Sequence, residues 1–188
     1  MSASKPNKHL IGLTGMPGAG KTLASEFAAQ LGYSVIVMGD VIRALTLEMN
    51  LKPTPENVGR VMLKIREEDG PAAVAERCIR LIKKMSSNVI IIEGIRSLDE
   101  VRAFKKSFPN FTLVALHASQ QTRFDRLNRR NRSDDSRLWE VFAERDSREL
   151  SVGLGSAIAS ADCMIVNEGT VAELRRNIKR SLDRIVSK

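Results

Sequence analysis

Five short apolar runs recur along the chain, separated by longer stretches whose apolar residues follow a helical spacing. The runs cover residues 10–14, 34–38, 89–92, 112–116 and 163–166. Each run is nearly continuous rather than alternating, which is typical of strands buried on both faces of a parallel sheet. Parallel strands connected through helices form three layers. The pattern therefore predicts an α/β fold with a five-stranded parallel sheet between helices.

No internal repeat, low-complexity tract or linker divides the sequence. Its 188 residues suit one domain with a substantial core, which we expect to span residues 9–188. Residues 1–8 are polar and predict a loose tail without the apolar segment of a signal peptide. No apolar run approaches the roughly 20 residues of a membrane span. We therefore expect a cytoplasmic protein with no membrane partner.

The first apolar run leads directly into a glycine-rich segment that precedes a helix-forming stretch, residues 23–31. Its eight residues are Gly15, Met16, Pro17, Gly18, Ala19, Gly20, Lys21 and Thr22. This is the phosphate-loop pattern, in which glycines turn backbone N–H groups toward an anion at a helix N-terminus. Lys21 would reach the terminal phosphates, and the Thr22 hydroxyl would ligate Mg²⁺. The segment predicts ATP and Mg²⁺ as cofactors.

Ligands of parallel sheets bind beyond the carboxyl ends of the strands, so the residues after each run are the next candidates. Asp40 and Arg43 follow the second run, with Asp40 where a helix cap would lie. Glu93, Gly94 and Arg96 follow the third run. A carboxylate beside a phosphate loop predicts a Mg²⁺ partner, direct or through water; the alternative is a helix cap. Arg96 offers a planar fork for a phosphate.

A helical pair lies between the second and third runs. Thr54 and Pro55 predict the cap and first residue of a helix that carries Arg60, and a second helix follows over residues 72–85. We expect residues 41–85 to form a cover over the acceptor, whose closure excludes water.

A strongly basic helix is predicted over residues 120–131. Arg126 and Arg130 are four residues apart and share a face, and Arg123 lies on the same side. Like charges at this spacing repel unless an anion lies between them, which favours a polyphosphate ligand. A solvated basic face is the alternative.

The last third of the chain supplies further candidates. Arg132 precedes a helix that runs to about residue 150 and carries Arg145. Its Trp139 is expected to pack rather than stack on a base, and glycines 153 and 155 are expected to break the chain before the last strand. Asn167 and Gly169 then open a helix over residues 171–185. That loop would line the binding site of the adenine ring. The alternative is that it is only a helix cap and a turn.

The formal net charge is +8, which fits either a nucleic-acid binder or arginines gathered around a polyphosphate. Much of the excess falls in residues 123–132, which favours the second explanation. Cys78 and Cys163 lack metal-ligand spacing and are expected to be buried thiols. His9 and His117 are poor catalytic candidates at the ends of predicted strands.

The ordered motifs resemble those of nucleoside monophosphate kinases, and of adenylate kinase in particular. The matching segments are residues 15–22; 39–43, similar to G-D-x-x-R; 93–96, similar to D-G-x-P-R; 125–130, similar to a lid-edge arginine pair; and 132–145, similar to R-x-D-D…R. Residues 161–169 also resemble dephospho-coenzyme A kinases, in which an aspartate placed like Asp40 is the base. As a whole, the chain most resembles archaeal adenylate-kinase-related proteins.

This resemblance implies a P-loop kinase fold with strand order 2-3-1-4-5. It implies that Arg43 and Arg96 hold the acceptor's phosphate. We expect Asp40, Arg60 and Gly94 to bind the acceptor as well. The resemblance also implies that four further arginines surround the transferring group in a short lid region, residues 126–145. These are Arg126, Arg130, Arg132 and Arg145.

The resulting hypothesis is ATP- and Mg²⁺-dependent phosphoryl transfer to a small phosphorylated acceptor, most simply AMP or another nucleoside monophosphate. If the acceptor carries a hydroxyl instead, as dephospho-coenzyme A does, Asp40 is the candidate base. Two alternatives are a kinase or NTPase that acts on RNA and an AMP or ATP sensor with little transfer activity. The sequence leaves the oligomeric state open.

Overall fold

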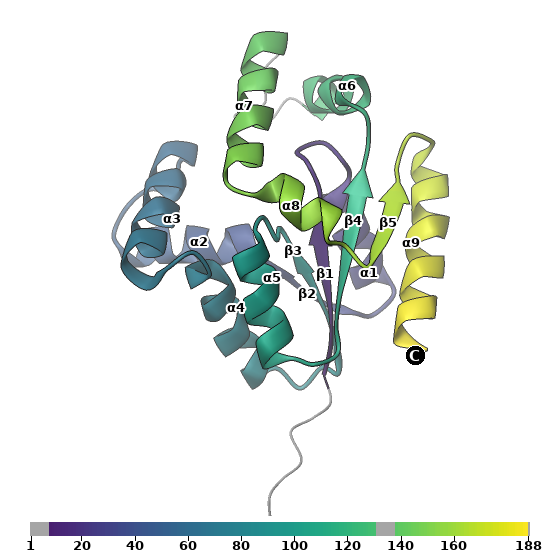
Figure 1. The fold of residues 1–188 in the computed structure, drawn as a ribbon, viewed down its shortest axis with the longest axis horizontal. Coiled ribbons are helices and arrows are strands. Elements are labelled where there is room, and N and C mark those ends of the chain that lie inside the picture. Colours follow the sequence, from purple (N-terminus) through teal and green to yellow (C-terminus); the bar gives the residue numbers. More distant parts are fainter. Residues whose placement is uncertain (1–7, 131–137, 188) are drawn as a thin grey trace, which may run out of the picture.

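The computed structural model describes residues 8–130 and 138–187. Their strands form one parallel sheet in the order β2-β3-β1-β4-β5 (Figure 1). The strands are β1 His9–Thr14, β2 Ser34–Val37, β3 Val89–Glu93, β4 Phe111–His117 and β5 Cys163–Val166. The predicted fold class and strand order are both confirmed.

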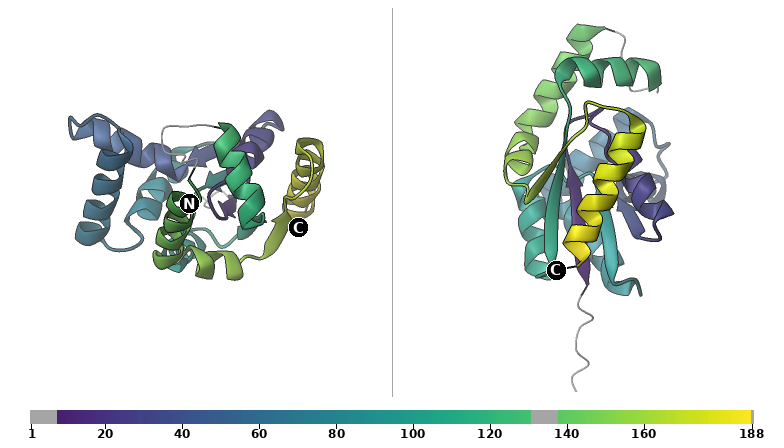
Figure 2. Two further views of the ribbon diagram at one scale, coloured as in Figure 1. Left: turned by 90° about the horizontal axis from the view of Figure 1, so that it is seen from above. Right: turned by 90° about the vertical axis from the view of Figure 1, so that its right-hand side faces the viewer.

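The helices are α1 Lys21–Gln30, α2 Met38–Glu48, α3 Pro55–Asp69, α4 Ala73–Lys84, α5 Leu98–Ser107, α6 Gln120–Arg130, α7 Trp139–Ser151, α8 Leu154–Ala159 and α9 Val171–Val186. Figures 1 and 2 show α1 and α9 on one face of the sheet and α4 and α5 on the other. Helices α6 and α7 lie beyond the carboxyl ends of the strands, at the top of Figure 1. The sheet therefore presents its carboxyl edge to a separate helical layer.

Each central strand is buried on both faces, which explains its continuous apolar sequence. Leu10 and Ile11 are adjacent and fully buried, yet they belong to different core clusters. Leu10 shares its cluster with Ile79 of α4, whereas Ile11 shares its cluster with Phe27 of α1. Since consecutive strand residues point to opposite faces, both must be apolar.

Several helix ends follow the expected local chemistry. Thr54 caps α3 by accepting a hydrogen bond from the Asn57 amide, and Pro55 begins the helix, as predicted. Thr170 and Glu173 form a reciprocal capping box at the start of α9. The start of the last predicted helix is thus fixed by its own first turn.

Three local predictions are wrong. Helix α2 begins at Met38, so Asp40 lies within its first turn rather than at the cap. Gly153 does break the chain, with φ of 99°, but Gly155 lies inside the short helix α8. Cys78 is buried, and burial raises its thiol pKa to about 12, whereas Cys163 is only half-buried. Local sequence pattern fixes neither the exact first residue of a helix nor the depth at which a side chain is buried.

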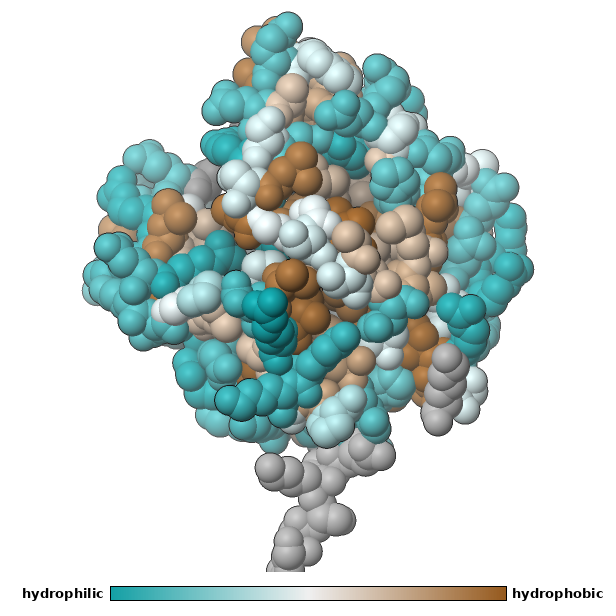
Figure 3. Space-filling view, in the orientation of Figure 1, coloured by the Kyte–Doolittle hydropathy of each residue, from teal (hydrophilic) through white to brown (hydrophobic). Residues whose placement is uncertain are grey.

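The predicted tail, residues 1–8, lies almost entirely outside the described residues. Its last residue, Lys8, is buried, and its ammonium donates to the Ser87 carbonyl at 2.9 Å. Among the described helices, none has the length and apolar character needed to cross a bilayer. The outer helices present mostly hydrophilic residues in Figure 3, with apolar residues near the middle of this face.

Candidate functional site

A cavity of about 750 Å³ lies beyond the carboxyl ends of the strands. It brings together these predicted site residues: Gly15, Pro17, Gly18, Gly20, Lys21, Thr22, Arg96, Arg126, Arg130, Arg145, Asn167 and Gly169. Predicted site residues absent from its described lining are Met16, Ala19, Asp40, Arg43, Arg60, Glu93 and Gly94. Arg132 lies outside the described residues. The phosphate loop and the arginines of α6 and α7 thus share one cavity.

The glycines of the phosphate loop are required by close contacts. Gly15 has φ of 144°, and a Cβ there would lie 2.3 Å from the Leu116 carbonyl oxygen of β4. Gly20 has φ of 106°, and a Cβ would lie 2.4 Å from Asn167 Nδ2. Since both φ values strain any L side chain, the loop needs glycine for its shape as well as for access to a ligand.

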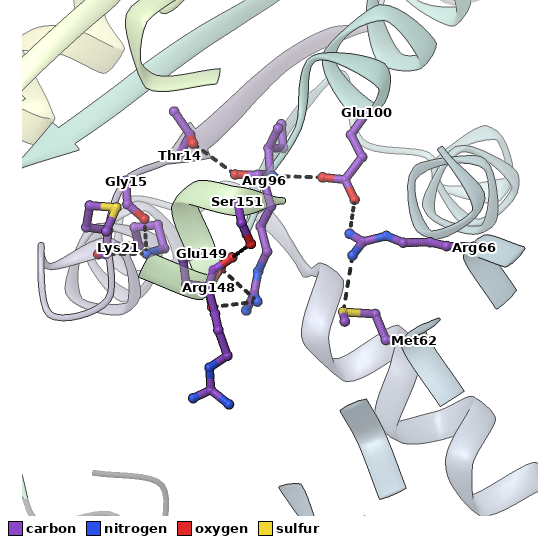
Figure 4. Close-up of polar contacts among 12 residues, drawn as sticks. Thr14, Gly15, Lys21, Met62, Arg66, Arg96, Glu100, Arg148, Glu149 and Ser151 are labelled. Atoms are coloured by element: carbon purple, nitrogen blue, oxygen red, sulfur yellow. Dashed lines mark hydrogen bonds and ion pairs between the residues drawn. The ribbon is translucent and has the colours of Figure 1, made fainter. Parts of the chain in front are cut away.

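Lys21 folds back onto its own loop. Its Nζ donates to the carbonyl oxygens of Gly15 at 2.6 Å and Met16 at 3.1 Å (Figure 4). Burial, and next the nearby charge of Arg96, lower the pKa of Lys21 to about 8, although Glu93 opposes that shift. An anion in the loop would offer this ammonium a stronger partner than a carbonyl.

Glu93 joins the phosphate loop through two hydroxyl groups. It is buried at the end of β3, where its Oε1 accepts from Thr22 Oγ1 at 2.9 Å and its Oε2 accepts from Ser25 Oγ at 2.5 Å. Ser97 caps the following helix, so Glu93 does not have the capping role that we considered. Ser25 belongs to no motif of the sequence, although it lies one helical turn after Thr22.

The oxygen atoms of Thr22 and Glu93 fit Mg²⁺, a hard cation that prefers oxygen ligands. Among the described residues, no group of three or more His, Cys, Asp or Glu could hold a metal by itself. A Mg²⁺ ion here would therefore take further ligands from nucleotide phosphates and water, as this ion usually does.

Arg123 has a structural role that contradicts our expectation. It is only 3% exposed, and its guanidinium makes two hydrogen bonds to the Asp146 carboxylate, at 2.8 and 2.5 Å. It also donates to the Pro17 carbonyl at 3.1 Å. We expected it to face an anion with the other arginines of its helix, but Asp146 of α7 already supplies the counter-charge. Arg123 thus fastens the phosphate loop to α6 and α7.

The segment after β5 contacts both the phosphate loop and α6. Asn167 is buried, and its Nδ2 donates to the Ala19 carbonyl at 2.9 Å. Its Oδ1 accepts from Arg126 Nη2 at 3.4 Å. Glu168 accepts from the Thr122 hydroxyl at 2.6 Å, and this bond is the largest cause of its lowered pKa. The turn after β5 therefore lines the cavity while hydrogen-bonded to both the phosphate loop and α6.

Arg96 connects three elements. Its Nη1 lies 2.9 and 3.2 Å from the two carboxylate oxygens of Glu149, a residue of α7 that the sequence analysis did not identify (Figure 4). Its backbone amide donates to Glu100 Oε2 at 2.7 Å. Glu100 is buried and accepts from Arg66 of α3 at 2.9 Å. The loop after β3 is thus joined to α3, α5 and α7.

The predicted acceptor residues of α2 and α3 lie apart from this network. Asp40 and Arg43 form an exposed ion pair within α2, and Arg60 pairs with Glu56 within α3. Each pair joins two residues of the same helix, and none of these four residues lines the cavity. Of the three predicted acceptor arginines, Arg96 lines the cavity, whereas Arg43 and Arg60 lie outside its lining.

Trp139 packs as predicted. Its ring meets Phe124 edge-on at a centroid distance of 5.1 Å and lies 5.3 Å from Phe142. These contacts join α6 to α7.

Comparison with known proteins shows the family to which this chain belongs. Residues 14–142 match the model of an AAA domain. A UPF0200 protein from Methanocaldococcus jannaschii is 46% identical over 180 residues, covering 95% of this chain and 91% of the relative. The chain belongs to the UPF0200 family. A second UPF0200 protein, from Methanothermobacter thermautotrophicus, is 43% identical over 97% of this chain and 93% of its own. The expected archaeal relationship is confirmed.

Solved structures of low sequence identity share the fold of this UPF0200 protein. Shikimate kinase from Acinetobacter baumannii, in complex with shikimate, has a TM-score of 0.59 at 17% identity, over 97% of this chain and 95% of its own. A gluconokinase from Sinorhizobium meliloti 1021 has a TM-score of 0.59 at 16% identity, with the same coverage. The protein TT1252 from Thermus thermophilus reaches 0.66 at 17%, over 96% and 97%. The fold is therefore that of P-loop kinases.

Proposed function

We propose that this UPF0200 protein transfers a phosphoryl group from Mg²⁺-ATP to a small phosphorylated acceptor, most simply AMP or another nucleoside monophosphate. The observation that carries this proposal is the composition of one cavity. The phosphate loop, Arg96 after β3, Arg126 of α6 and Arg145 of α7 all line it. Phosphoryl transfer requires placement and charge neutralisation more than covalent help, and this lining supplies both.

The phosphate loop is the donor side of the proposed site. Lys21 would exchange its bonds to the Gly15 and Met16 carbonyls for oxygens of the β- and γ-phosphates. Thr22 and Glu93 would hold Mg²⁺, Glu93 directly or through water. Bound there, Mg²⁺ neutralises charge on the phosphates.

Arg126 supports an anion in this cavity. Its Nη1 is buried and has no hydrogen-bond partner among the described residues, whereas its Nη2 is bonded to Asn167. A buried donor without an acceptor is costly, and more so when charged. A phosphate oxygen would satisfy this donor. Asn167 and Gly169, on the same side, would lie beside the adenosine part of ATP.

On the acceptor side, Arg96 would hold the acceptor's phosphate. An oxygen of that phosphate attacks the γ-phosphorus, and a new P–O bond forms as the bond to the β-phosphate's bridging oxygen breaks, releasing ADP. The attacking oxygen already carries charge at neutral pH, so no base is needed. Asp40 and Arg43 would join only if α2 moved toward the cavity when the cover closes.

The test is a transfer assay with the full chain, labelled ATP and Mg²⁺. The acceptors are a panel of nucleoside monophosphates, dephospho-coenzyme A, shikimate, gluconate and short RNA. We expect product with at least one nucleoside monophosphate, and a loss of about 100-fold or more in Lys21→Ala. Lys64→Ala is the matched control, because Lys64 is exposed on α3.

Other results would replace the proposal. Product only with a hydroxyl acceptor would change the acceptor class. Product only with RNA, with affinity that falls steeply with salt, would indicate a nucleic-acid substrate. Binding of AMP or ATP without turnover would favour a sensor, and unchanged transfer in Lys21→Ala would remove the mechanism.

A further inference from the structure

Glu149 is an acidic residue at a cavity whose arginines we assign to phosphates. It lines the cavity, and its side chain is only 14% exposed. Both of its carboxylate oxygens contact Arg96, and both contact the same atom, Nη1. A carboxylate that bound Arg96 as fully as possible would instead take two nitrogens in a fork.

This one-nitrogen contact leaves the other edge of the guanidinium available. Arg96 Nε and Nη2 have no hydrogen-bond acceptor among the described residues, and the side chain is 45% exposed at the cavity. The Nε–Nη2 edge carries two parallel N–H donors, the arrangement that matches two oxygens of a phosphate.

Arg96 is also held at its other end. Its backbone amide donates to Glu100, which is 1% exposed and paired with Arg66. Figure 4 shows the two glutamates at opposite ends of the arginine, with Glu100 at the backbone and Glu149 at the guanidinium. A long side chain fixed at both ends loses most of its rotamer freedom before a ligand arrives.

We propose that Glu149 is a positioning residue that orients the Arg96 guanidinium so that its Nε–Nη2 edge receives a phosphate monoester. This inference rests on the proposed function, since it assigns Arg96 to the acceptor. It adds a residue that no motif of the sequence indicated. Glu149 touches Arg96 rather than the reacting atoms, so its effect is on acceptor binding rather than on the chemical step.

The electrostatic setting agrees with this role. Arg145 lies one helical turn before Glu149 on α7 and also lines the cavity. Lys21, Arg96 and Arg145 all line the same cavity as Glu149. Glu149 thus offsets part of the repulsion among three cations that must stay close together without a ligand.

The experiment measures AMP binding by calorimetry and, where turnover exists, the kinetic constants for AMP and ATP. We expect Glu149→Ala to weaken AMP binding about tenfold, the loss of one charge-assisted hydrogen bond that holds the arginine. KM for AMP should rise while kcat and the KM for ATP change less than about twofold. Glu149→Gln keeps a carbonyl acceptor for Nη1 and should recover most of the affinity.

Two controls make the result specific. Glu144→Ala removes the same charge from an exposed position of α7 and should leave AMP binding unchanged. Once Arg96→Ala is present, adding Glu149→Ala should weaken AMP binding no further, because the two residues act as one unit. The Nε–H resonance of Arg96 should broaden or shift in Glu149→Ala without AMP.

Several outcomes would overturn the inference. Tighter AMP binding in Glu149→Ala would make the carboxylate a competitor of the phosphate. Equal losses for AMP and ATP would make Glu149 a general support of α7, and additive effects with Arg96→Ala would separate the two residues. A wild-type chain that does not bind AMP also ends it. If the protein binds AMP but transfers no phosphoryl group, only the proposed function is wrong.

Discussion

The phosphate loop and the helical pair α2–α3 are held in place differently. The phosphate loop is fastened by residues from remote parts of the chain: Arg123 binds the Pro17 carbonyl, and Asn167 binds the Ala19 carbonyl. On α2 and α3, by contrast, Asp40 and its neighbours pair along their own helix and are exposed. The difference indicates a phosphate loop whose shape is fixed before any ligand binds, and charges on α2 and α3 that remain exposed to solvent.

Because the ion pairs differ in burial, they should contribute differently to the free energy of unfolding. The Arg123 and Asp146 side chains are each 4% exposed, whereas those of Arg43 and Asp40 are 50% and 62% exposed. Removing one partner of a buried pair leaves an uncompensated charge, at a cost of about 3–5 kcal/mol. An exposed pair contributes about 0–1 kcal/mol. Stability measurements can therefore test the comparison directly.

The largest expected effect is on Asp146. Asp146→Ala should lower the free energy of unfolding by about 3–5 kcal/mol, because Arg123 is left buried without its counter-charge. Urea denaturation followed by circular dichroism measures it. Glu144→Ala, at an exposed position of the same helix, should stay within about 0.5 kcal/mol. A loss below about 1 kcal/mol for Asp146→Ala would remove the contrast between the two sides.

A smaller effect is expected at Ser25. Ser25→Ala removes one of the two hydroxyl donors to buried Glu93 and should lower the unfolding free energy by about 1.5–3 kcal/mol. Ser147→Ala is the matched control, since that hydroxyl is exposed and donates to the Ala143 carbonyl of its own helix. If both variants unfold alike, Glu93 does not depend on the serine.

The next prediction concerns protons. The pKa of Lys21 is about 8, so above pH 8 its amine is mostly neutral in the ligand-free loop. Bound phosphates favour the charged form and raise that pKa. ATP binding at pH 9 should therefore take up most of one proton, and affinity should fall as pH rises past 8. Calorimetry in buffers of different ionisation enthalpy measures the uptake; Lys21→Met should lack it, and equal uptake there would assign it to another group.

The smallest effect on stability is expected on the acceptor side. Asp40→Asn and Arg43→Gln should each change the unfolding free energy by less than about 1 kcal/mol, as exposed pairs do. Arg43→Gln should nevertheless raise KM for the acceptor if α2 moves toward the cavity during turnover. Kinetics with AMP at saturating ATP check this, and an unchanged KM would confine the acceptor site to Arg96 and its neighbours.

The sequence predicted the parts of this fold that depend on local pattern. The strands are continuous apolar runs because both faces are buried, and the phosphate loop is a contiguous motif. The sequence could not distinguish the structural role of Arg123 from the cavity-lining role of Arg126, because both lie on one basic helix. Only the tertiary fold brings Asp146 next to Arg123. Glu149 escaped notice for the same reason, as its partner Arg96 lies 53 residues away. Long-range charge pairing leaves no mark on helical spacing.

The bond from Asn167 to the Ala19 carbonyl bears on how the protein is made. On the ribosome the phosphate loop emerges first, yet the side chains that brace it, Arg123, Asp146 and Asn167, emerge more than a hundred residues later. A nascent chain that ends before Arg123 has the whole glycine-rich motif without any of these supports, and one that ends before β5 still lacks Asn167. Newly synthesised protein should thus gain tight nucleotide affinity only after Asn167 has emerged.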